Sequence, residues 1–258
     1  MITSAANGQI KEIEKLQKKA KHRSEVGVFT VEGRKMVLEA GERLQKAYLS
    51  ESYYNTYGAS ELGACQYEIV ADNVFKGMSE TMTPQGILGL VQMPKYSLDE
   101  LLQGERVQLL LLENLRDPGN LGTIIRTAEG AGVTGVILSK ESVDIFNPKV
   151  IRSTMGSIYR VPFVYTDDFY GTLEELKKQN ISLYAAHLKG KNDYDAESYG
   201  ERTGVLIGNE ANGLTEEAAF LADCLVKIPM EGQVESLNAA IAATVFMYEI
   251  YRQRRTKR

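Results

Sequence analysis

A run of six residues, Val107-Gln108-Leu109-Leu110-Leu111-Leu112, carries five apolar side chains and one polar side chain. Such a run is typical of a strand buried on both faces of a parallel sheet. An amphipathic helix pattern follows over residues 121–131, and another apolar run covers residues 135–138. Strand and helix patterns then alternate to the end of the chain. This alternation predicts an α/β fold with a mostly parallel sheet and helices on both of its faces.

The remaining elements of this C-terminal region follow from apolar periodicity. We expect strands at residues 161–165, 182–186, 204–207 and 225–228, and helices at residues 148–155, 173–179, 216–221 and 235–252. On the last of these helices, Leu237, Ile241, Val245 and Tyr248 fall on one stripe. The stripe predicts one apolar face for the C-terminal helix.

The region before Val107 gives a second, smaller α/β pattern. A lysine-rich helix is expected over residues 8–20, and a short helix over residues 34–40. Strands are expected at residues 28–31, 47–50, 67–70 and 87–91. Pro94 and the polar residues 95–105 are typical of a linker. The sequence thus predicts one domain over residues 1–93, a linker over 94–105 and a second domain over 106–258.

Composition excludes several classes of protein. The chain has 258 residues, 43% of them hydrophobic and 25% charged, which excludes disordered, collagen-like and disulfide-rich proteins. No apolar run approaches the length of a membrane span, so no membrane partner is expected. The first residues lack a secretory signal, and Cys65 and Cys224 form no C-x-x-C motif. These features predict a cytoplasmic protein.

The formal net charge of −4 hides an uneven distribution. Residues 1–46 carry a net charge of +4 and residues 252–258 a net charge of +5, so both ends are cationic and the middle is anionic. Two cationic ends are compatible with contact to a polyanion such as RNA. On charge alone, two solvated helix faces are the simpler interpretation.

One motif matches the dinucleotide-binding fingerprint in sequence but not in its predicted structural context. Residues 130–135 match G-x-G-x-x-G, but they end a helix and lead into a strand, whereas the dinucleotide fingerprint follows a strand and opens a helix. We interpret them as a helix C-cap and turn, which disfavours a nucleotide-dependent oxidoreductase. His22 and His187 lie far apart in the sequence, and no metal-binding motif is present, so no metal is expected.

Three segments carry candidate chemistry, and the first, residues 114–128, follows the buried strand. Asn120 is placed to N-cap the next helix. Arg126 lies away from that helix's apolar face, where a guanidinium can reach a phosphate or a reacting oxygen. A plain surface arginine is the alternative.

The other two segments also follow strands and enter helices. Residues 205–214 end in a loop in which Glu210 can accept hydrogen bonds or hold an arginine. In residues 228–243, Ser236 and Asn238 are expected in the first turn of the last helix, where backbone N–H groups are free. Helix capping alone is the alternative in both cases. Ligands of open α/β sheets bind beyond the carboxyl ends of strands, where these segments lie.

In order, the segments read Asn-x-Gly-x-Ile-x-Arg-Thr-Ala, Gly-x-Glu-x-x-Gly-Leu and Ile-Pro-Met-x-Gly-x-x-x-Ser-Leu-Asn. Together they resemble the SpoU (TrmH-type) family of RNA ribose 2′-O-methyltransferases over residues 106–251. Residues 1–93 resemble that family's substrate-binding domain, a small ribosomal-protein-like α/β fold, and Gly33 fits its pattern. No motif position departs from the family.

The resemblance implies a deep trefoil knot in the C-terminal domain and a homodimer that pairs through the C-terminal helix. It implies S-adenosylmethionine as the cofactor, in a site made by the knotted loops. The residues expected at that site are Gly208, Ile228, Leu237, Met230, Ser236, Asn238, His187 and Leu188.

The resemblance also assigns catalytic roles, to Arg126, Asn120, Glu210, Ser236 and Asn238. Arginine is a weak base, so a phosphate or Glu210 would assist in removing the proton from the ribose hydroxyl. Alternatively, Arg126 only positions that hydroxyl while a phosphate takes the proton.

RNA is the expected partner. The residues expected to bind it are Lys11, Lys15, Lys18, Lys19, Lys21, Arg23 and Arg34. The separate N-terminal domain resembles that of family members acting on large-subunit ribosomal RNA, which implies 23S ribosomal RNA as the substrate. We favour guanosine over uridine as the methylated nucleoside. The alternatives are a transfer RNA 2′-O-methyltransferase and a non-enzymatic RNA-binding module with a cofactor-free knot.

Overall fold

The computed structural model describes residues 1–256 and divides into two compact units. The first unit joins Met1–Pro94 with Asp144–Tyr159, and the second joins Lys95–Val143 with Arg160–Arg258. Residues 144–159, which the sequence analysis assigned to the C-terminal domain, therefore group with the N-terminal unit. Lys257 and Arg258, at the end of the cationic segment 252–258, lie outside the described residues.

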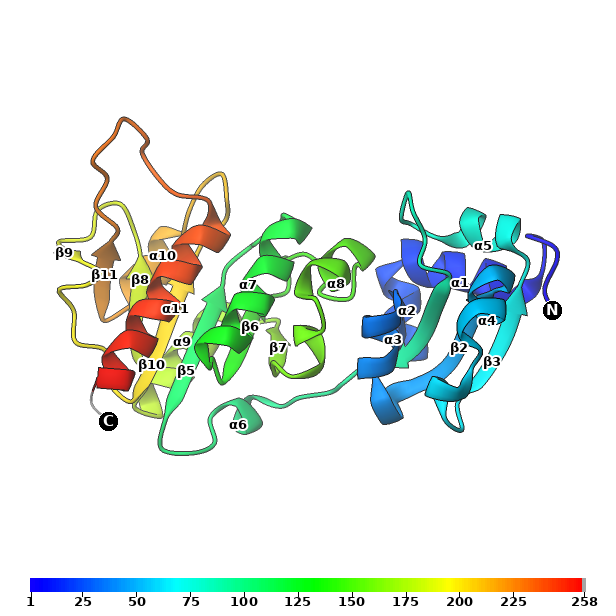
Figure 1. The fold of residues 1–258 in the computed structure, drawn as a ribbon. Helices are drawn as coiled ribbons and strands as arrows, with labels where there is room; N and C mark the ends of the chain where they lie inside the picture. Colours follow the sequence, from blue (N-terminus) through cyan, green and yellow to red (C-terminus); the bar gives the residue numbers. More distant parts are fainter. Residues whose placement is uncertain (257–258) are drawn as a thin grey trace. The chain divides into compact units, whose positions relative to one another are not determined.

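The first unit is built on a four-stranded mixed sheet (Figure 1). Its strands are β1 (Val28–Glu32), β2 (Leu44–Ser50), β3 (Gln66–Val70) and β4 (Ile87–Gln92), in the order β1-β4-β2-β3. Strand β4 pairs antiparallel with both β1 and β2, and β2 pairs parallel with β3. All four strands overlap the predicted ranges, although β2 begins three residues earlier than expected.

Helices of the first unit cover this sheet. They are α1 (Gly8–Lys18), α2 (Ala20–Val26), α3 (Arg34–Glu39), α4 (Glu51–Tyr57), α5 (Asp72–Met78) and α8 (Pro148–Thr154). Ile10 and Ile13 of α1 pack with Phe75 of α5 in one core cluster. The expected helix over residues 8–20 ends at Lys18, because Lys19 adopts an extended conformation between α1 and α2.

The segment Asp144–Tyr159 is tied to the first unit by polar and aromatic contacts. The Tyr159 hydroxyl donates to the Met36 carbonyl at 2.8 Å, and Arg43 Nη1 donates to the Tyr159 carbonyl at 3.3 Å. The rings of Phe29 and Phe146 lie 4.8 Å apart, centroid to centroid. These contacts explain why the segment belongs to this unit by packing.

The second unit contains a seven-stranded sheet in which every paired strand is parallel to its neighbour. The strand order is β7-β6-β5-β10-β8-β11-β9. The strands are β5 (Val107–Leu112), β6 (Gly135–Ser139), β7 (Phe163–Thr166), β8 (Ser182–Ala186), β9 (Asn192–Asp193), β10 (Arg202–Ile207) and β11 (Cys224–Lys227). All six residues of β5 are buried, as the apolar run predicted, and the predicted α/β class is confirmed.

Helices lie on both faces of this sheet. They are α6 (Leu98–Leu101), α7 (Pro118–Ala131), α9 (Phe169–Lys178), α10 (Glu216–Leu221) and α11 (Ala239–Thr256). Figure 1 shows α7 and α11 in front of the sheet and α9 and α10 behind it. The expected linker contributes to the core of this unit, because Leu101 and Leu102 are buried in the cluster that holds Leu173 and Leu206.

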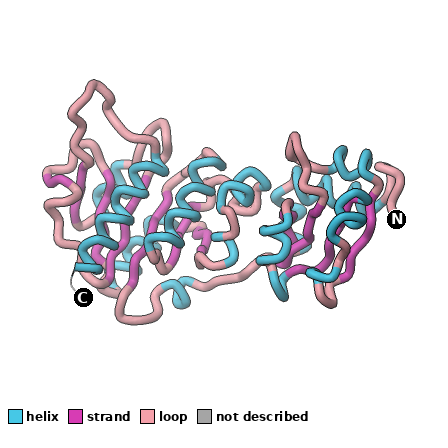
Figure 2. The backbone as a smooth tube through the Cα atoms, viewed as in Figure 1, coloured by secondary structure: helices cyan, strands magenta, loops and turns pink. Residues whose placement is uncertain are grey.

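Two helix starts differ from the sequence-based expectation. Asp117, not Asn120, is the N-cap of α7: its side chain accepts from the Asn120 backbone N–H, and Pro118 occupies the first helical position. Helix α11 begins at Ala239, so Ser236 and Asn238 lie before it, in the long loop from β11 to α11 (Figure 2). Asn238 Oδ1 accepts from the Ala240 backbone N–H at 2.9 Å and caps the helix from outside.

The predicted apolar stripe of the last helix does not face the core. Ile241 is 50% exposed and Tyr248 is 46% exposed, whereas Phe246 and Ile250 are fully buried. Helix α11 therefore packs on the core through other positions, such as Phe246 and Ile250. The face that carries Ile241 and Tyr248 is exposed to solvent. Within residues 1–256, no helix is long and apolar enough to cross a membrane.

Candidate active site

A cavity of about 710 Å³ lies at the carboxyl ends of β8, β10 and β11. All eight residues predicted to bind the cofactor line it, together with Asn120 and Glu210. The loops that follow these three strands and the first residues of α7 and α11 meet around this space. Three motifs that are far apart in the sequence thus contribute to one cavity, at the edge where a parallel sheet binds its ligands.

The loop after β10 needs glycine at its first position. A Cβ atom on Gly208 would lie 2.1 Å from the carbonyl carbon of Gly213, which is far inside van der Waals contact. Asn209 and Gly213 exchange two backbone hydrogen bonds, of 3.0 and 2.8 Å, that close the loop. Asn209 Nδ2 also donates to the Asn114 carbonyl at 2.7 Å, which ties this loop to the end of β5.

The loop after β8 supplies the opposite wall. The His187 backbone N–H donates to the Val226 carbonyl at 2.9 Å, and His187 Nδ1 accepts from the Lys189 backbone N–H at 3.0 Å. Burial, with the nearby Lys189 charge, lowers the pKa of His187, so the imidazole is neutral at pH 7. Leu188 is 63% exposed at the rim of the cavity.

A hydrogen-bonded chain of side chains connects all three motifs. Glu210 accepts from the backbone N–H groups of Arg116 at 3.1 Å and Asp117 at 2.9 Å, and from Asn120 Nδ2 at 3.0 Å. Asn120 Oδ1 in turn accepts from Asn238 Nδ2 at 2.8 Å. These hydrogen bonds fix the orientation of the Asn120 and Asn238 amides at the cavity wall.

These contacts also set the charge of Glu210. Partial burial acts to raise the pKa of Glu210, but the hydrogen bonds from Asn120, Arg116 and Asp117 outweigh it and lower that pKa. From the sequence alone, Glu210 could either accept hydrogen bonds or hold an arginine. The structure shows that it accepts from two backbone groups and one amide.

Arg126 lies apart from the other predicted catalytic residues. It is exposed on α7 and is not among the residues that line the cavity. Within residues 1–256, its guanidinium makes no hydrogen bond or ion pair. The structure thus brings Asn120, Glu210, Ser236 and Asn238 together and leaves Arg126 on the outer face of α7.

Sequence reasoning missed residues that position the site. Glu113 is 2% exposed and accepts from the Thr215 backbone N–H at 2.8 Å and the Thr215 hydroxyl at 2.7 Å, which holds the start of α10. Asn114 has a positive φ of 54°. A glutamate and an asparagine directly after a buried strand were the available signal, because that position is the ligand-binding edge of a parallel sheet.

A model of the SpoU rRNA Methylase family matches residues 108–248, more than half of the chain. The chain belongs to the SpoU rRNA Methylase family. A model of the MRM3-like substrate binding domain matches residues 7–89. The resemblance predicted from the three motifs is confirmed.

Relatives of known structure or name agree with this family over nearly the whole chain. The 23S rRNA (guanosine(2553)-2′-O)-methyltransferase RlmP of Bacillus subtilis is 33% identical over 96% of this chain and 98% of its own. The SpoU methyltransferase AviRb from Streptomyces viridochromogenes, in complex with AdoMet, has a TM-score of 0.89 and 29% identity, covering 98% of this chain and all of its own. An AdoMet-bound rRNA methyltransferase from Sinorhizobium meliloti has a TM-score of 0.85 and 32% identity, with 97% of each chain covered.

As a SpoU-family member, the chain is an RNA methyltransferase whose cofactor is S-adenosylmethionine. The cavity fits that cofactor. Its volume lies within the range of small-molecule sites, and it combines apolar side chains such as Ile207, Leu237 and Phe246 with the polar backbone of three strand ends. Asp117 and Glu235 place carboxylates in the same lining, which suits a ligand with cationic sulfonium and ammonium groups.

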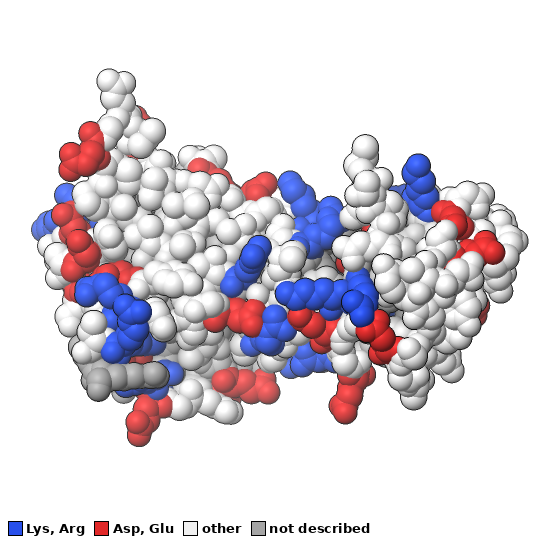
Figure 3. Space-filling model, viewed as in Figure 1, with Lys and Arg blue, Asp and Glu red and all other residues white. Residues whose placement is uncertain are grey.

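The five lysines predicted to bind RNA divide into two groups. Lys11 and Lys19 are exposed. Lys15, Lys18 and Lys21 are exposed but lie 3.6–3.9 Å from glutamates one turn away. Surface pairs of this kind are weak, so these lysines remain available to phosphate. On the face drawn in Figure 3, Lys and Arg side chains gather over α2, α3 and α8.

The arginines differ from these lysines. Arg23 is 3% exposed, with Nη1 donating to the carbonyl of Gln17 at 3.0 Å and Nε donating to Asp144 Oδ2 at 3.0 Å. Its prediction as an RNA contact was wrong, because the guanidinium lies in the interior and holds α2 against residues 144–159. Arg34 is exposed and paired with Glu61, which raises its pKa.

Proposed function

We propose that the chain transfers a methyl group from S-adenosylmethionine to a ribose 2′-hydroxyl of 23S ribosomal RNA, with guanosine favoured over uridine. The observation that carries the proposal is the meeting of three motif loops around one cavity at the carboxyl edge of the sheet. The name and 33% identity of the RlmP relative, over 96% of this chain, support ribosomal RNA as the substrate.

The cofactor supplies an electrophilic methyl carbon on a sulfonium leaving group. The protein's task is to place the ribose oxygen in line with that carbon and to ease removal of its proton. Asn120, held by Glu210 and Asn238, is positioned to orient the ribose. Glu210 is a poor candidate for the proton acceptor, because its three hydrogen bonds stabilise the carboxylate and lower its pKa.

We propose that Arg126 acts on the methyl acceptor, which is the ribose 2′-hydroxyl of the RNA. A guanidinium group stays charged in proteins, so Arg126 acts by binding phosphate and stabilising the charge that develops on the ribose oxygen. An RNA phosphate then takes the proton. Arg126 is exposed and lies outside the cavity of its own chain. In a dimer, it can instead lie next to the cofactor that the other subunit binds.

A homodimer formed through α11 fits this requirement. The exposed apolar face of α11 carries Ile241 and Tyr248, and α11 packs directly on α7, which carries Arg126. A Cβ on Gly130 of α7 would lie 3.2 Å from the Tyr248 hydroxyl, so this face and the C-terminal part of α7 are continuous. In the proposed dimer, Arg126 of each subunit acts at the other subunit's cavity, and the C-terminal segment forms a trefoil knot. We place this enzyme in the cytoplasm, without a metal.

Two other functions give different experimental results. A transfer RNA methyltransferase would use the same cavity but place the methyl group on transfer RNA. A non-enzymatic RNA-binding module would give no heat of binding when S-adenosylmethionine is added in a calorimeter.

Mapping 2′-O-methyl groups in a strain that lacks the gene tests the proposal. We expect one ribose methylation to disappear from 23S ribosomal RNA and to return when the wild-type gene is supplied. An unchanged ribosomal RNA together with a missing methyl group on transfer RNA would contradict the assignment.

A further inference from the structure

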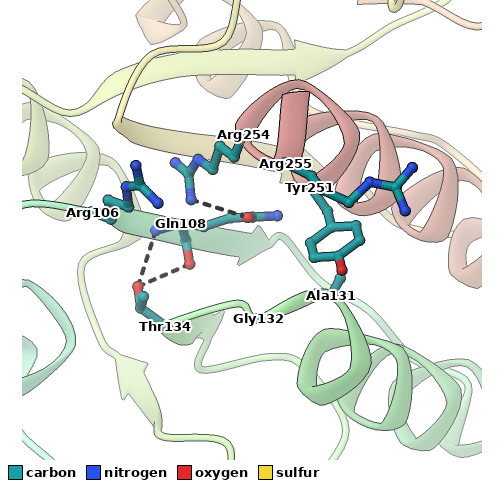
Figure 4. Close-up of a pocket in the computed structure, with 8 residues that line it drawn as sticks. All are labelled: Arg106, Gln108, Ala131, Gly132, Thr134, Tyr251, Arg254 and Arg255. Carbon is teal, nitrogen blue, oxygen red and sulfur yellow. Dashed lines mark hydrogen bonds between the residues drawn. The ribbon is translucent and has the colours of Figure 1, made fainter. Parts of the chain in front are cut away.

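A second, smaller cavity lies at the other end of the parallel sheet. It measures about 200 Å³, and its lining residues are Arg106, Gln108, Ala131, Gly132, Thr134, Tyr251, Arg254 and Arg255 (Figure 4). They come from the start of β5, the end of α7 and the last turns of α11. None of these residues lines the cofactor cavity, and Arg254 and Arg255 belong to the cationic C-terminal end.

The cavity is rich in positive charge. Arg106 and Arg254 lie on one side of it, and Tyr251 and Arg255 on the other (Figure 4). One acidic group offsets part of this charge: Glu201 Oε2 lies 2.9 Å from Arg106 Nε. The Arg255 guanidinium lies 5.8 Å from the centre of the Tyr251 ring. The cluster therefore keeps an excess of positive charge.

Arg254 is held rigidly at the back of this space. Its Nη2 donates to the carbonyls of Val107 at 3.1 Å, Gly200 at 3.1 Å and Glu201 at 2.9 Å, and its Nη1 donates to Gln108 Oε1 at 3.2 Å. Its Nε is buried and has no partner in the described residues. A buried N–H without a partner is costly, and a bound acceptor would remove that cost.

The electrostatics of Arg254 agree with an anion site. Burial and the nearby Arg106 charge lower the pKa of Arg254, whereas Glu201 acts to raise it. Two like charges held close together in a partly buried place repel each other, and an anion between them relieves that repulsion. Guanidinium groups match the geometry of phosphate oxygens.

We propose that this cavity is a phosphate-binding site that holds a backbone phosphate of the bound RNA, away from the reacting nucleotide. Its place supports RNA as the source of the phosphate. The site lies at the amino end of β5, roughly 20 Å from the carboxyl end of that strand, so it would hold a nucleotide several positions from the target. Phosphate contacts of this kind fix the register of a nucleic acid and carry no sequence information. The choice of RNA as the source of the phosphate rests on the proposed function. The binding of phosphate itself does not depend on that function.

The first experiment uses inorganic phosphate as the probe and the full chain as the protein. Resonances of the arginine Nε–H groups are followed during the titration, with sodium chloride added to hold ionic strength constant. We expect the Arg254 Nε–H resonance to shift in a saturable way, and this shift to disappear in the double variant Arg106→Gln/Arg255→Gln. No shift, or an equal shift in the double variant, would overturn the phosphate site.

The second experiment measures binding of the full chain to transcribed, unmodified 23S ribosomal RNA over a range of salt concentrations. We expect the same double variant to lose about tenfold in affinity and to show a slope of log K against log salt that is shallower by about one. The matched control Lys140→Gln/Lys178→Gln removes two positive charges from exposed sites elsewhere on the same unit. It should change RNA affinity less than about twofold, because exposed charges far from a bound phosphate are screened.

Arg254 is left unchanged in both experiments, because its four hydrogen bonds hold the end of α11 and its loss would destabilise the fold. Affinity for S-adenosylmethionine and the sedimentation coefficient of the double variant should equal those of the wild type.

An equal loss of RNA affinity in the control would overturn the site by showing a non-specific charge effect. If phosphate shifts the Arg254 Nε–H resonance but the double variant keeps its RNA affinity, RNA is not the source of the bound phosphate. If the double variant changes its oligomeric state and the phosphate-induced shift is absent, both the phosphate site and its RNA source are overturned. Failure of methyl transfer would leave the phosphate titration unaffected, so the two proposals fail separately.

Discussion

The two ends of the parallel sheet in the second unit use polar residues in different ways. At the carboxyl end, Glu210, Asn120 and Asn238 bond to one another and to loop backbone, so polarity there shapes a cavity. At the amino end, Arg106 and Arg255 flank a small cavity with an excess of positive charge. Substitutions at the carboxyl end should therefore change geometry and turnover, and substitutions at the amino end should change affinity for an anion.

Two helices connect these ends. Asn120 of α7 and Ala242 of α11 line the larger cavity, whereas Ala131 of α7 and Arg254 of α11 line the smaller one. Arg126 lies between them on α7 and serves neither cavity of its own chain. A substitution at Arg126 is thus the sharpest way to separate chemistry from binding.

Arg126→Ala should have the largest effect. We expect methyl transfer to fall at least about 100-fold, because a charge that stabilises a developing oxyanion is lost, while affinity for S-adenosylmethionine stays within about twofold. Transfer of a labelled methyl group and calorimetry measure the two quantities. Activity within about tenfold of wild type would contradict the role of Arg126.

Mixing variants tests whether Arg126 acts across the proposed dimer. Leu237→Arg blocks the cavity and Arg126→Ala removes the guanidinium, so each variant alone is inactive. If the arginine acts at the other subunit's cavity, unfolding and reassembling equal amounts should restore about a quarter of wild-type activity, since half of the dimers gain one complete site. No recovery, with mixed dimers shown by mass spectrometry, would place Arg126 and its cavity in the same subunit.

Gly208→Ala should have the next largest effect. The added Cβ would meet the Gly213 carbonyl carbon at 2.1 Å, so the loop must move away from the cavity. We expect affinity for S-adenosylmethionine to fall about 100-fold, with a stability cost of about 1–3 kcal/mol. Gly232→Ala is the matched control in the loop before α11, because its Cβ would meet nothing within 4 Å. Equal affinities of the two variants would show that the loop after β10 does not shape the cofactor site.

Ile241→Asp tests the proposed dimer. Ile241 is 50% exposed on the open face of α11, so a carboxylate there should not unfold the subunit but should oppose burial of that face. We expect monomers by analytical ultracentrifugation at micromolar concentration and about 30-fold less methyl transfer. Phe220→Asp, at a position of α10 that is 87% exposed, is the control and should leave the mass unchanged. A stable dimer of the Ile241 variant would contradict pairing through α11.

Glu210→Gln should have the smallest effect and a pH signature. Because hydrogen bonds lower the pKa of Glu210 in the folded chain, its contribution to stability is complete above the unfolded pKa of about 4.3 and is lost as pH falls through the folded value. Wild type should therefore lose stability between about pH 5 and pH 3 more steeply than the variant. At pH 7, we expect a cost of at most about 1 kcal/mol, because the carboxylate is only partly buried and water screens its interactions. Parallel pH curves in thermal unfolding would show that these hydrogen bonds contribute nothing.

Strands were easier to predict than the site's contacts. The run from Val107 to Leu112 is typical of a buried strand, and the structure has one there. The N-cap of α7 was harder to predict, because Asp117 and Asn120 are both suitable capping residues and only the structure shows that Asp117 is used. The start of α11 was placed at residue 235 because apolar periodicity continues through Leu237, although the chain stays in a loop until Ala239. Such boundaries depend on long-range contacts, which local periodicity does not contain.

The motif residues that the sequence singled out lie together in the structure, but the surroundings of single residues could not be predicted. Eight predicted cofactor residues line one cavity because each motif follows a strand of the same parallel sheet. By contrast, burial of Arg23 depends on Asp144, more than one hundred residues away, and no local pattern carries that information. The exposed stripe with Ile241 and Tyr248 had the pattern of a core face, because periodicity does not say what covers it.

The most direct test of the central claim is methyl transfer by the purified chain to unmodified 23S ribosomal RNA, followed by complete nuclease digestion and mass spectrometry of the nucleosides. The account predicts one new 2′-O-methylated nucleoside, close to one per RNA molecule, with S-adenosylmethionine as the methyl source. The Arg126→Ala protein should give none. A methyl group found on a base instead of a ribose, or transfer by Arg126→Ala at the wild-type rate, would contradict the account.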